Sequence, residues 1–145
     1  MQFIVRNVPA IGNCLFEAVG RSIDVSASDL RQRTVEWMMI PNQTLFGDSF
    51  QTWLGDVSVE KYSNSMSKNG TWGGGIELAI IAKLIHRPIV VFASNSSELN
   101  TAKRIAEFIP DLDSSIPTKK EELDNLSTVC VLYVGGSHYM QIEIK

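Results

Sequence analysis

The period of the hydrophobic pattern changes near residue 86, and no other feature of the 145-residue sequence constrains the fold as much. Before that point apolar residues recur at helical spacing, which is typical of helices packed on one side. After it, residues 88–93 and 128–134 form short, nearly continuous apolar runs rich in β-branched side chains, as in buried strands. The change predicts an α+β fold in which helices flank a central, mostly antiparallel sheet.

Capping residues and helix breakers indicate where the helices begin and end. Ser26, followed three positions later by Asp29, is typical of a helix N-terminus, and Pro41 ends the segment that it starts. The segment after Gly73-Gly74-Gly75 is apolar nearly all round, so we expect it to be central and buried. Five helices are expected, at residues 14–19, 26–40, 45–54, 59–66 and 76–85.

Strands are expected at residues 3–5, 88–93, 103–109, 128–134 and 138–144. The last two are separated by Gly135-Gly136-Ser137, a loop length that favours a hairpin. Residues 111–127 are polar and contain the charged cluster Lys119-Lys120-Glu121-Glu122. We therefore expect that segment to form a surface excursion outside the core.

Length and composition favour a single domain over residues 1–145. Hydrophobic residues make up 44% of the chain and charged residues 20%, which is enough for a core without metal or disulfide support. The net charge of −3 argues against binding to nucleic acid, which needs a basic surface. The apolar runs are far shorter than the ~20 residues that cross a bilayer, and the first residues lack a signal-peptide pattern. We expect a cytoplasmic monomer that binds neither nucleic acid nor membranes.

The two cysteines, Cys14 and Cys130, lie in different surroundings. Cys14 follows Gly12-Asn13 and opens a predicted helix, where backbone N–H groups and the helix dipole stabilise a thiolate. Such a thiolate at the mouth of a cleft is a nucleophile; the alternative is a small buried residue at a helix start. Cys130 lies inside an apolar run and is expected to be structural. Two cysteines without a Cys-x-x-Cys pair favour a reducing compartment, and no metal or cofactor is expected.

A cysteine nucleophile needs a base, and the sequence contains two histidines. His138 begins the last predicted strand directly after the glycine turn, a position from which a side chain can reach the rim of a cleft. His86 lies between the end of the 76–85 helix and Pro88, where it suits a helix C-cap. We therefore predict that His138 is the base.

A third group that orients the imidazole is less evident. Two positions after His138 stands Met140, whose thioether is a weak acceptor, and three before Cys14 stands Ile11. Asn7, seven positions before Cys14, is the nearest amide that can fold back over the site. A triad with Asn7 and a dyad of Cys14 and His138 both remain open.

Three separated blocks resemble the ovarian tumour (OTU) family of cysteine proteases. Ile11-Gly12-Asn13-Cys14-Leu15-Phe16 is similar to that family's nucleophile block, Asp-Gly-Asn-Cys followed by an aromatic residue. Trp72-Gly73-Gly74 with Glu77-Leu78 resembles its central Trp-Gly-Gly-x-x-Glu-Leu element, and Gly136-Ser137-His138-Tyr139 resembles its terminal histidine block. The order and spacing of the blocks agree along almost the whole chain, which makes Cys14 the predicted nucleophile.

The resemblance implies a papain-like OTU fold and hydrolysis of the isopeptide bond that joins the C-terminus of ubiquitin, or of a ubiquitin-like modifier, to lysine. Cys14 would attack the carbonyl, and His138 would accept the thiol proton and later protonate the leaving amine. The implied oxyanion hole consists of backbone amides at Ile11, Gly12 and Asn13. A slot for the Gly-Gly tail of ubiquitin is implied at four residues: Trp72, Gly73, Gly74 and Gly136.

Two positions depart from the family's pattern. Ile11 stands where the family usually has Asp, and Met140 stands where it often has Asn or Asp. Some divergent members, notably viral ones, have Asn seven residues before the nucleophile, which Asn7 matches. The alternatives to an active deubiquitinase are therefore a weak or dead ubiquitin-binding pseudoenzyme and a viral polyprotein protease with deubiquitinating activity. For a viral protein or a bacterial effector, the expected compartment is the host cytosol.

Overall fold

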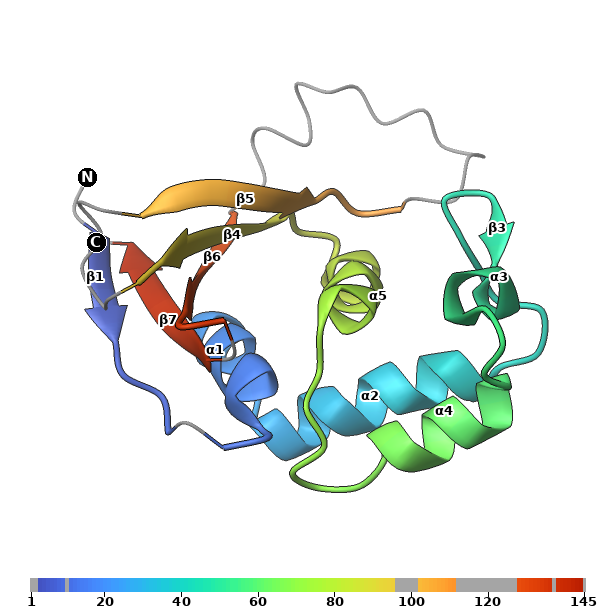
Figure 1. Ribbon diagram of the computed structural model, residues 1–145. Coiled ribbons are helices and arrows are strands. Elements are labelled where there is room, and N and C mark those ends of the chain that lie inside the picture. The colour runs from blue at the N-terminus through green and yellow to red at the C-terminus, as the bar shows by residue number, and fades with distance from the viewer. Residues whose placement is uncertain (1–2, 10, 96–101, 112–127, 137, 145) are drawn as a thin grey trace.

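The computed structural model describes residues 3–9, 11–95, 102–111, 128–136 and 138–144. Within these ranges, five helices accompany a five-stranded sheet, and α1 and α5 lie between the sheet and α2 (Figure 1). The helices are α1 (Cys14–Ile23), α2 (Ala27–Met39), α3 (Phe50–Leu54), α4 (Val59–Met66) and α5 (Gly75–Ile85). This architecture confirms the predicted α+β class.

The sheet has the strand order β1-β7-β6-β4-β5. Its strands are β1 (Phe3–Arg6), β4 (Ile89–Ser94), β5 (Lys103–Phe108), β6 (Val129–Val134) and β7 (His138–Ile144). Neighbours are antiparallel except β4 and β6, which run parallel with Ile89 opposite Val129. β6 and β7 form the predicted hairpin, in which Val134 faces His138 across the turn. The sheet is therefore mixed and mostly antiparallel, as expected.

The core lies mainly between the helices and one face of the sheet. Side chains of α1, α2 and α5 pack there against inward residues of β6 such as Val131, which is fully buried. Alternation along the strands sends Cys130 and Met140 to the opposite face, where they form a second, smaller cluster. Ile80 and Ile81 have no exposed surface, so α5 is the central buried helix that its apolar sequence predicts.

Local capping explains most helix boundaries. The Ser26 side chain accepts a hydrogen bond from the Asp29 N–H at 3.1 Å, which confirms the predicted start of α2. His86 ends α5 in the left-handed conformation with φ 55°, as expected for a C-cap. The predicted surface excursion at residues 111–127 lies outside the described residues except for Asp111.

The helix predicted at residues 45–54 is wrong in its first half. A two-stranded hairpin of β2 (Thr44–Leu45) and β3 (Asp48–Ser49) occupies that stretch, and α3 begins only at Phe50. Phe46 and Gly47 turn the chain with φ values of 50° and 85°, which no right-handed helix accommodates. Ser49 then caps α3 by accepting from the Thr52 N–H at 3.2 Å. Across the described residues, no helix is both long and apolar enough to cross a membrane.

Candidate active site

Cys14 is the first residue of α1, and its sulfur lies against the start of β7. The backbone N–H of Tyr139 donates to Cys14 Sγ at 3.5 Å. The Cα of His138 is two bonds from that nitrogen, so it lies within about 6 Å of the sulfur. The fold thus brings together two residues from opposite ends of the chain. Cys14 is only 1% exposed, so the sulfur lies deeper than the cleft mouth at which the sequence predicts it.

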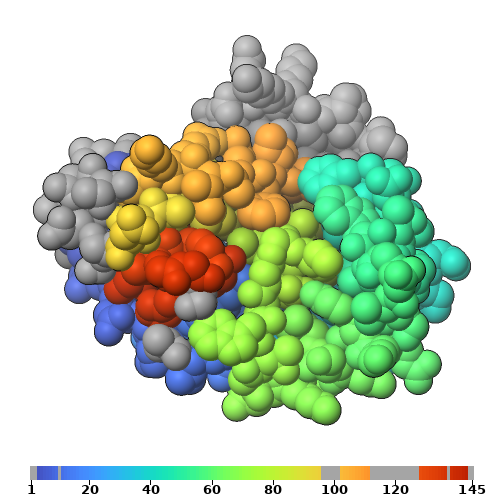
Figure 2. Space-filling model, viewed as in Figure 1, coloured from blue at the N-terminus to red at the C-terminus, as the bar shows by residue number. Residues whose placement is uncertain are grey.

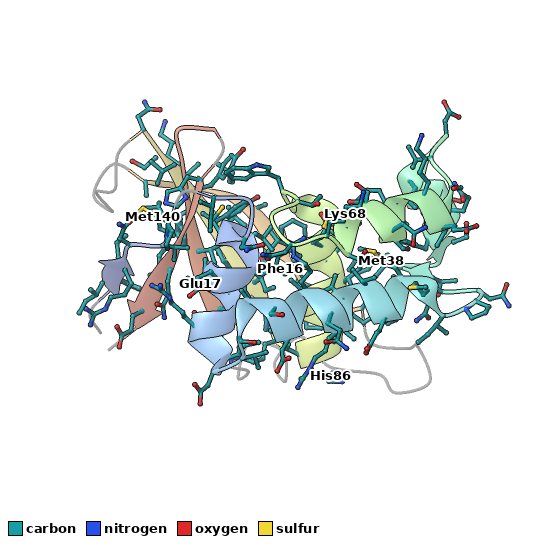
Figure 3. All side chains as sticks on the ribbon, turned by 90° about the horizontal axis from the view of Figure 1, so that it is seen from below. Phe16, Glu17, Met38, Lys68, His86 and Met140 are labelled. Atoms are coloured by element: carbon teal, nitrogen blue, oxygen red, sulfur yellow. The ribbon has the colours of Figure 1, made fainter. Side chains whose placement is uncertain are left out.

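His138 carries a buried nitrogen with no partner. Among the described residues, no hydrogen bond reaches its Nδ1, although this atom is shielded from solvent. Buried polar atoms in folded proteins nearly always have a partner, so an exception calls for an explanation. A nitrogen that has to accept a proton during a reaction is such a case. By contrast, His86 is exposed at the far end of α5, well away from Met140 of β7 (Figure 3).

The loop before Cys14, residues 11–13, is here called the oxyanion loop. The Ile11 N–H donates to the Pro9 carbonyl at 2.9 Å, and the Cys14 N–H donates to the Ile11 carbonyl at 3.0 Å. Within the described part of the chain, the amides of Gly12 and Asn13 have no such bond. Of the three predicted oxyanion donors, the N–H of Ile11 is engaged, whereas those of Gly12 and Asn13 bond to no backbone carbonyl of the described residues.

The oxyanion loop is docked on a turn at residues 68–71, here called the 68–71 turn. A Cβ placed on Gly12 would lie 1.5 Å from the carbonyl oxygen of Gly70, so only glycine fits there. The Asn13 side chain donates to Asn69 Oδ1 at 2.7 Å and accepts from the Gly70 N–H at 2.9 Å. The position of the oxyanion loop thus depends on a segment more than 50 residues away in sequence.

Arg31 lies beneath this contact and was not anticipated as a site residue. It is 4% exposed, and its guanidinium donates to Asn13 Oδ1 at 2.7 Å and to the Thr71 carbonyl at 2.8 Å. Burial lowers the pKa of Arg31, and the carboxylate of Glu77 opposes that effect. A sequence signal existed, because Arg31 lies among the buried positions of α2 that include Leu30 and Thr34. A charged residue on the apolar face of a helix indicates a buried polar cluster.

A groove of about 450 Å³ runs alongside the site, and all four residues predicted for the ubiquitin tail line it. Trp72, Gly73 and Gly74 form one wall and Gly136 part of the other, and these two segments adjoin on the face seen in Figure 2. Sequence reasoning missed the aromatic lining: Phe108, Tyr133 and Tyr139. Tyr139 therefore lines the groove and also contacts the thiol, because its backbone N–H donates to Cys14 Sγ.

Two tyrosines shape the wall opposite Trp72. The rings of Tyr133 and Tyr139 lie with centroids 4.8 Å apart, and the Tyr133 hydroxyl donates to the Gly136 carbonyl. Burial, with smaller contributions from Tyr133 and Cys14, raises the pKa of Tyr139 to about 12. Gly136 has φ 76°, a conformation that favours glycine. The hairpin end is therefore held in shape by its own residues.

Glu77 fixes the other wall. Its carboxylate accepts from the Gly74 N–H at 2.7 Å and from the Tyr62 hydroxyl at 2.6 Å, and the residue is 1% exposed. Burial raises the pKa of Glu77, and the two hydrogen bonds and the Arg31 charge oppose that rise. Burial and the same hydrogen bond also raise the pKa of Tyr62. The start of α5, and with it Gly73 and Gly74, is thereby tied to α4.

The structure does not join Asn7 to the imidazole. Asn7 is exposed after β1, and its backbone carbonyl accepts from Arg21 at 2.8 Å. His138 Nδ1 has no partner among the described residues, so the Asn7 amide is not bonded to that nitrogen. Met140 is 7% exposed in the cluster with Cys130, so it serves packing and cannot orient the base. Burial also raises the pKa of the Cys130 thiol, as suits a structural cysteine.

The sequence of the chain is similar to sequences of known proteins. A family model described as OTU-like cysteine protease matches residues 9–139 of the chain. Ubiquitin thioesterase otu2 of Schizosaccharomyces pombe is 24% identical over 145 residues, which cover 92% of this chain and 43% of that protein. The chain spans less than half the length of the curated relatives that it matches.

Solved structures share the fold. The OTU domain of OTUD1 superposes with a TM-score of 0.72 at 15% identity, covering 98% of this chain and 86% of that one. An OTU deubiquitinase from Wolbachia pipientis wMel bound to ubiquitin has a TM-score of 0.68 at 18% identity, covering 97% and 95%. In the described ranges, no group of three or more His, Cys, Asp or Glu side chains is arranged to hold a metal ion.

Proposed function

Because the chain belongs to the family of OTU-like cysteine proteases, we propose that it is a cysteine-type deubiquitinase. It hydrolyses the isopeptide bond at the C-terminus of ubiquitin or of a ubiquitin-like modifier. The observation that carries the proposal is the hydrogen bond from the Tyr139 N–H to Cys14 Sγ, which joins the helix-start thiol to the strand that begins with His138. Curated relatives named ubiquitin thioesterases, and neighbours solved bound to ubiquitin, support the choice of substrate.

In the proposed reaction, His138 takes the proton of Cys14 and the sulfur attacks the isopeptide carbonyl. An S–C bond forms, and the negative charge on oxygen is held by the N–H groups of Gly12 and Asn13. When the tetrahedral intermediate collapses, the C–N bond breaks and the lysine amine leaves with the proton from His138. Water then hydrolyses the thioester, which releases the carboxylate and regenerates the thiol. Neither a metal nor a cofactor takes part.

The groove suits an extended tail that carries no side chains. Four of the residues that line it are glycines, and aromatic and aliphatic side chains line the rest. Two glycines at the end of a protein tail fit that space. We further propose that residues 1–145 form one catalytic domain that acts as a monomer in the cytosol, or in the host cytosol for a viral or bacterial protein.

A ubiquitin electrophilic probe, which reacts covalently with an active-site thiol, tests the proposal. We expect one adduct, located at Cys14 by mass spectrometry, and cleavage of ubiquitin chains by the same protein. Cys14→Ala removes both, whereas Cys130→Ala retains both because Cys130 lies in the second cluster. A folded protein that forms no adduct refutes the proposal, and loss of the adduct in Cys130→Ala alone refutes the choice of nucleophile.

The second candidate is a ubiquitin-binding pseudoenzyme, and it is favoured because no hydrogen bond joins His138 Nδ1 to Cys14 Sγ in the described structure. Catalysis is weak when the base and the nucleophile are not aligned. Titration with ubiquitin separates the two candidates. Saturable binding with no product at any protein concentration supports the pseudoenzyme, and chain cleavage that Cys14→Ala abolishes excludes it.

A further inference from the structure

We propose that Arg31 is a positioning residue that sets the direction of an oxyanion-hole amide by holding the oxyanion loop to the 68–71 turn. The inference rests on the proposed protease function, although one of its tests does not need activity. Arg31 itself is buried in α2 and is not among the residues that line the groove.

The guanidinium of Arg31 bridges three segments of the chain. Its Nη2 has two hydrogens and donates to Asn13 Oδ1 at 2.7 Å and to the Thr71 carbonyl at 2.8 Å, and the Gly12 carbonyl at 3.3 Å shares one of these hydrogens. Its Nη1 donates to the Met66 carbonyl, at the end of α4, at 3.0 Å. One side chain therefore fixes the oxyanion loop, the 68–71 turn and α4 relative to one another.

The α1 side of this cluster is closed by an aromatic ring. Arg31 Cζ lies 4.4 Å from the centroid of the Phe16 ring, an arrangement in which the ring face attracts the cation. Phe16 on α1 and Lys68 in the 68–71 turn are both labelled in Figure 3. Phe16 has no exposed surface, so the guanidinium has little room to move.

The bond to the Gly12 carbonyl bears directly on the oxyanion hole. The Gly12 carbonyl and the Asn13 N–H belong to one planar trans peptide, so they point in opposite directions. A carbonyl held toward Arg31 therefore turns the Asn13 N–H away from Arg31 and fixes its direction. Without that hold, the peptide can rotate as a unit, and glycine at position 12 offers little resistance.

Lysine cannot replace arginine in this role. The Arg31 guanidinium is planar and holds five N–H donors in a fixed fork. Its acceptors belong to Asn13, Gly12, Thr71 and Met66. The ammonium group of a lysine has only three donors, on a flexible stem. Arg31→Lys keeps the positive charge near Glu77 but leaves at least one acceptor without its donor. The pair Arg31→Lys and Arg31→Met thus separates the charge from the geometry.

The experiment compares these two variants with Arg33→Met, an exposed arginine on the same helix, as the matched control. Four quantities are measured: kcat and KM on a fluorogenic ubiquitin amide, the rate of Cys14 alkylation by iodoacetamide, and hydrogen exchange of the Gly70 N–H. Alkylation creates no oxyanion, so it reports thiol reactivity alone. The Gly70 N–H is bonded to Asn13 Oδ1, so its exchange reports the docking of the oxyanion loop.

We expect Arg31→Met to lower kcat by at least about 30-fold and Arg31→Lys by at least about 10-fold, with KM and the alkylation rate changed less than about threefold. Exchange of the Gly70 N–H becomes at least about tenfold faster in Arg31→Met, and Arg33→Met matches the wild type throughout. The proposal is overturned if kcat of folded Arg31→Lys equals that of Arg33→Met, or if kcat and alkylation fall together. A wild-type protein without activity would refute the proposed function, and the Gly70 exchange alone would then decide on Arg31.

Discussion

Replacing Gly12 by alanine tests the close contact on which the oxyanion loop depends. The added Cβ would lie 1.5 Å from the Gly70 oxygen and 2.3 Å from its carbonyl carbon, whereas ordinary van der Waals contact begins at 3.4 Å. The atoms in the way are backbone atoms, so no flexible side chain can yield. The oxyanion loop and the 68–71 turn must therefore separate by about 2 Å.

This separation affects stability and activity to different extents. Overpacking of a folded interior costs about 1–3 kcal/mol of unfolding free energy, so the Tm falls but the protein remains folded. A displacement of about 1 Å at a reacting centre already costs about 100-fold in rate. We therefore expect kcat of Gly12→Ala to fall by at least about 100-fold, which corresponds to about 2.7 kcal/mol of barrier.

The assay is hydrolysis of a fluorogenic ubiquitin amide, measured below the Tm of every variant. The matched control is Gly55→Ala at the end of α3, where φ is 65° and no atom lies within 4 Å of the added Cβ. The angles at Gly55, φ 65° and ψ −120°, are ones that residues other than glycine rarely adopt, so the change costs about 1–3 kcal/mol through backbone strain, but it does not touch the site. Gly55→Ala should retain wild-type kcat. A Gly12→Ala variant within threefold of wild type, or equal losses in the two variants, would refute the reasoning.

Three further experiments test other parts of the site. Asn7→Ala lowers turnover at least about tenfold, or about 1.4 kcal/mol of barrier, if Asn7 completes a triad, and an unchanged kcat contradicts the triad. Burial raises the pKa of Glu77, so the folded protein binds that proton more tightly than the unfolded chain, and stability declines as the pH rises through the folded pKa. Glu77→Gln should therefore lose less Tm than wild type as the pH rises above 4.5, the ordinary pKa of glutamate, and equal slopes in thermal melts contradict the assignment. Cys14 is 1% exposed, so a bulky aromatic disulfide reagent should react with it at least about 100-fold more slowly than with free cysteine, while the ubiquitin probe still labels it. A rate equal to that of free cysteine would show that the sulfur is open to solvent.

Local sequence signals predicted most of the fold. The capping pair Ser26 and Asp29 marked the start of α2, and the apolar segment after Gly75 became the central helix. The prediction failed at residues 45–54, because the turn at Phe46 and Gly47 depends on backbone angles that hydrophobic spacing does not report. Periodicity and capping involve residues a few positions apart, so they can be read without knowing the packing.

The sequence by itself determined that a thiol opens a helix, that a histidine begins the last strand, and that glycines precede α5. Only the tertiary structure decided that the strand amide of Tyr139 reaches Cys14, that Arg31 lies beneath the oxyanion loop, and that aromatic residues of β5, β6 and β7 line the groove. The physical reason is the range of the interactions involved. Helix starts and strand ends follow from neighbouring residues, whereas these contacts join segments separated by tens of residues, whose positions depend on how the whole core packs.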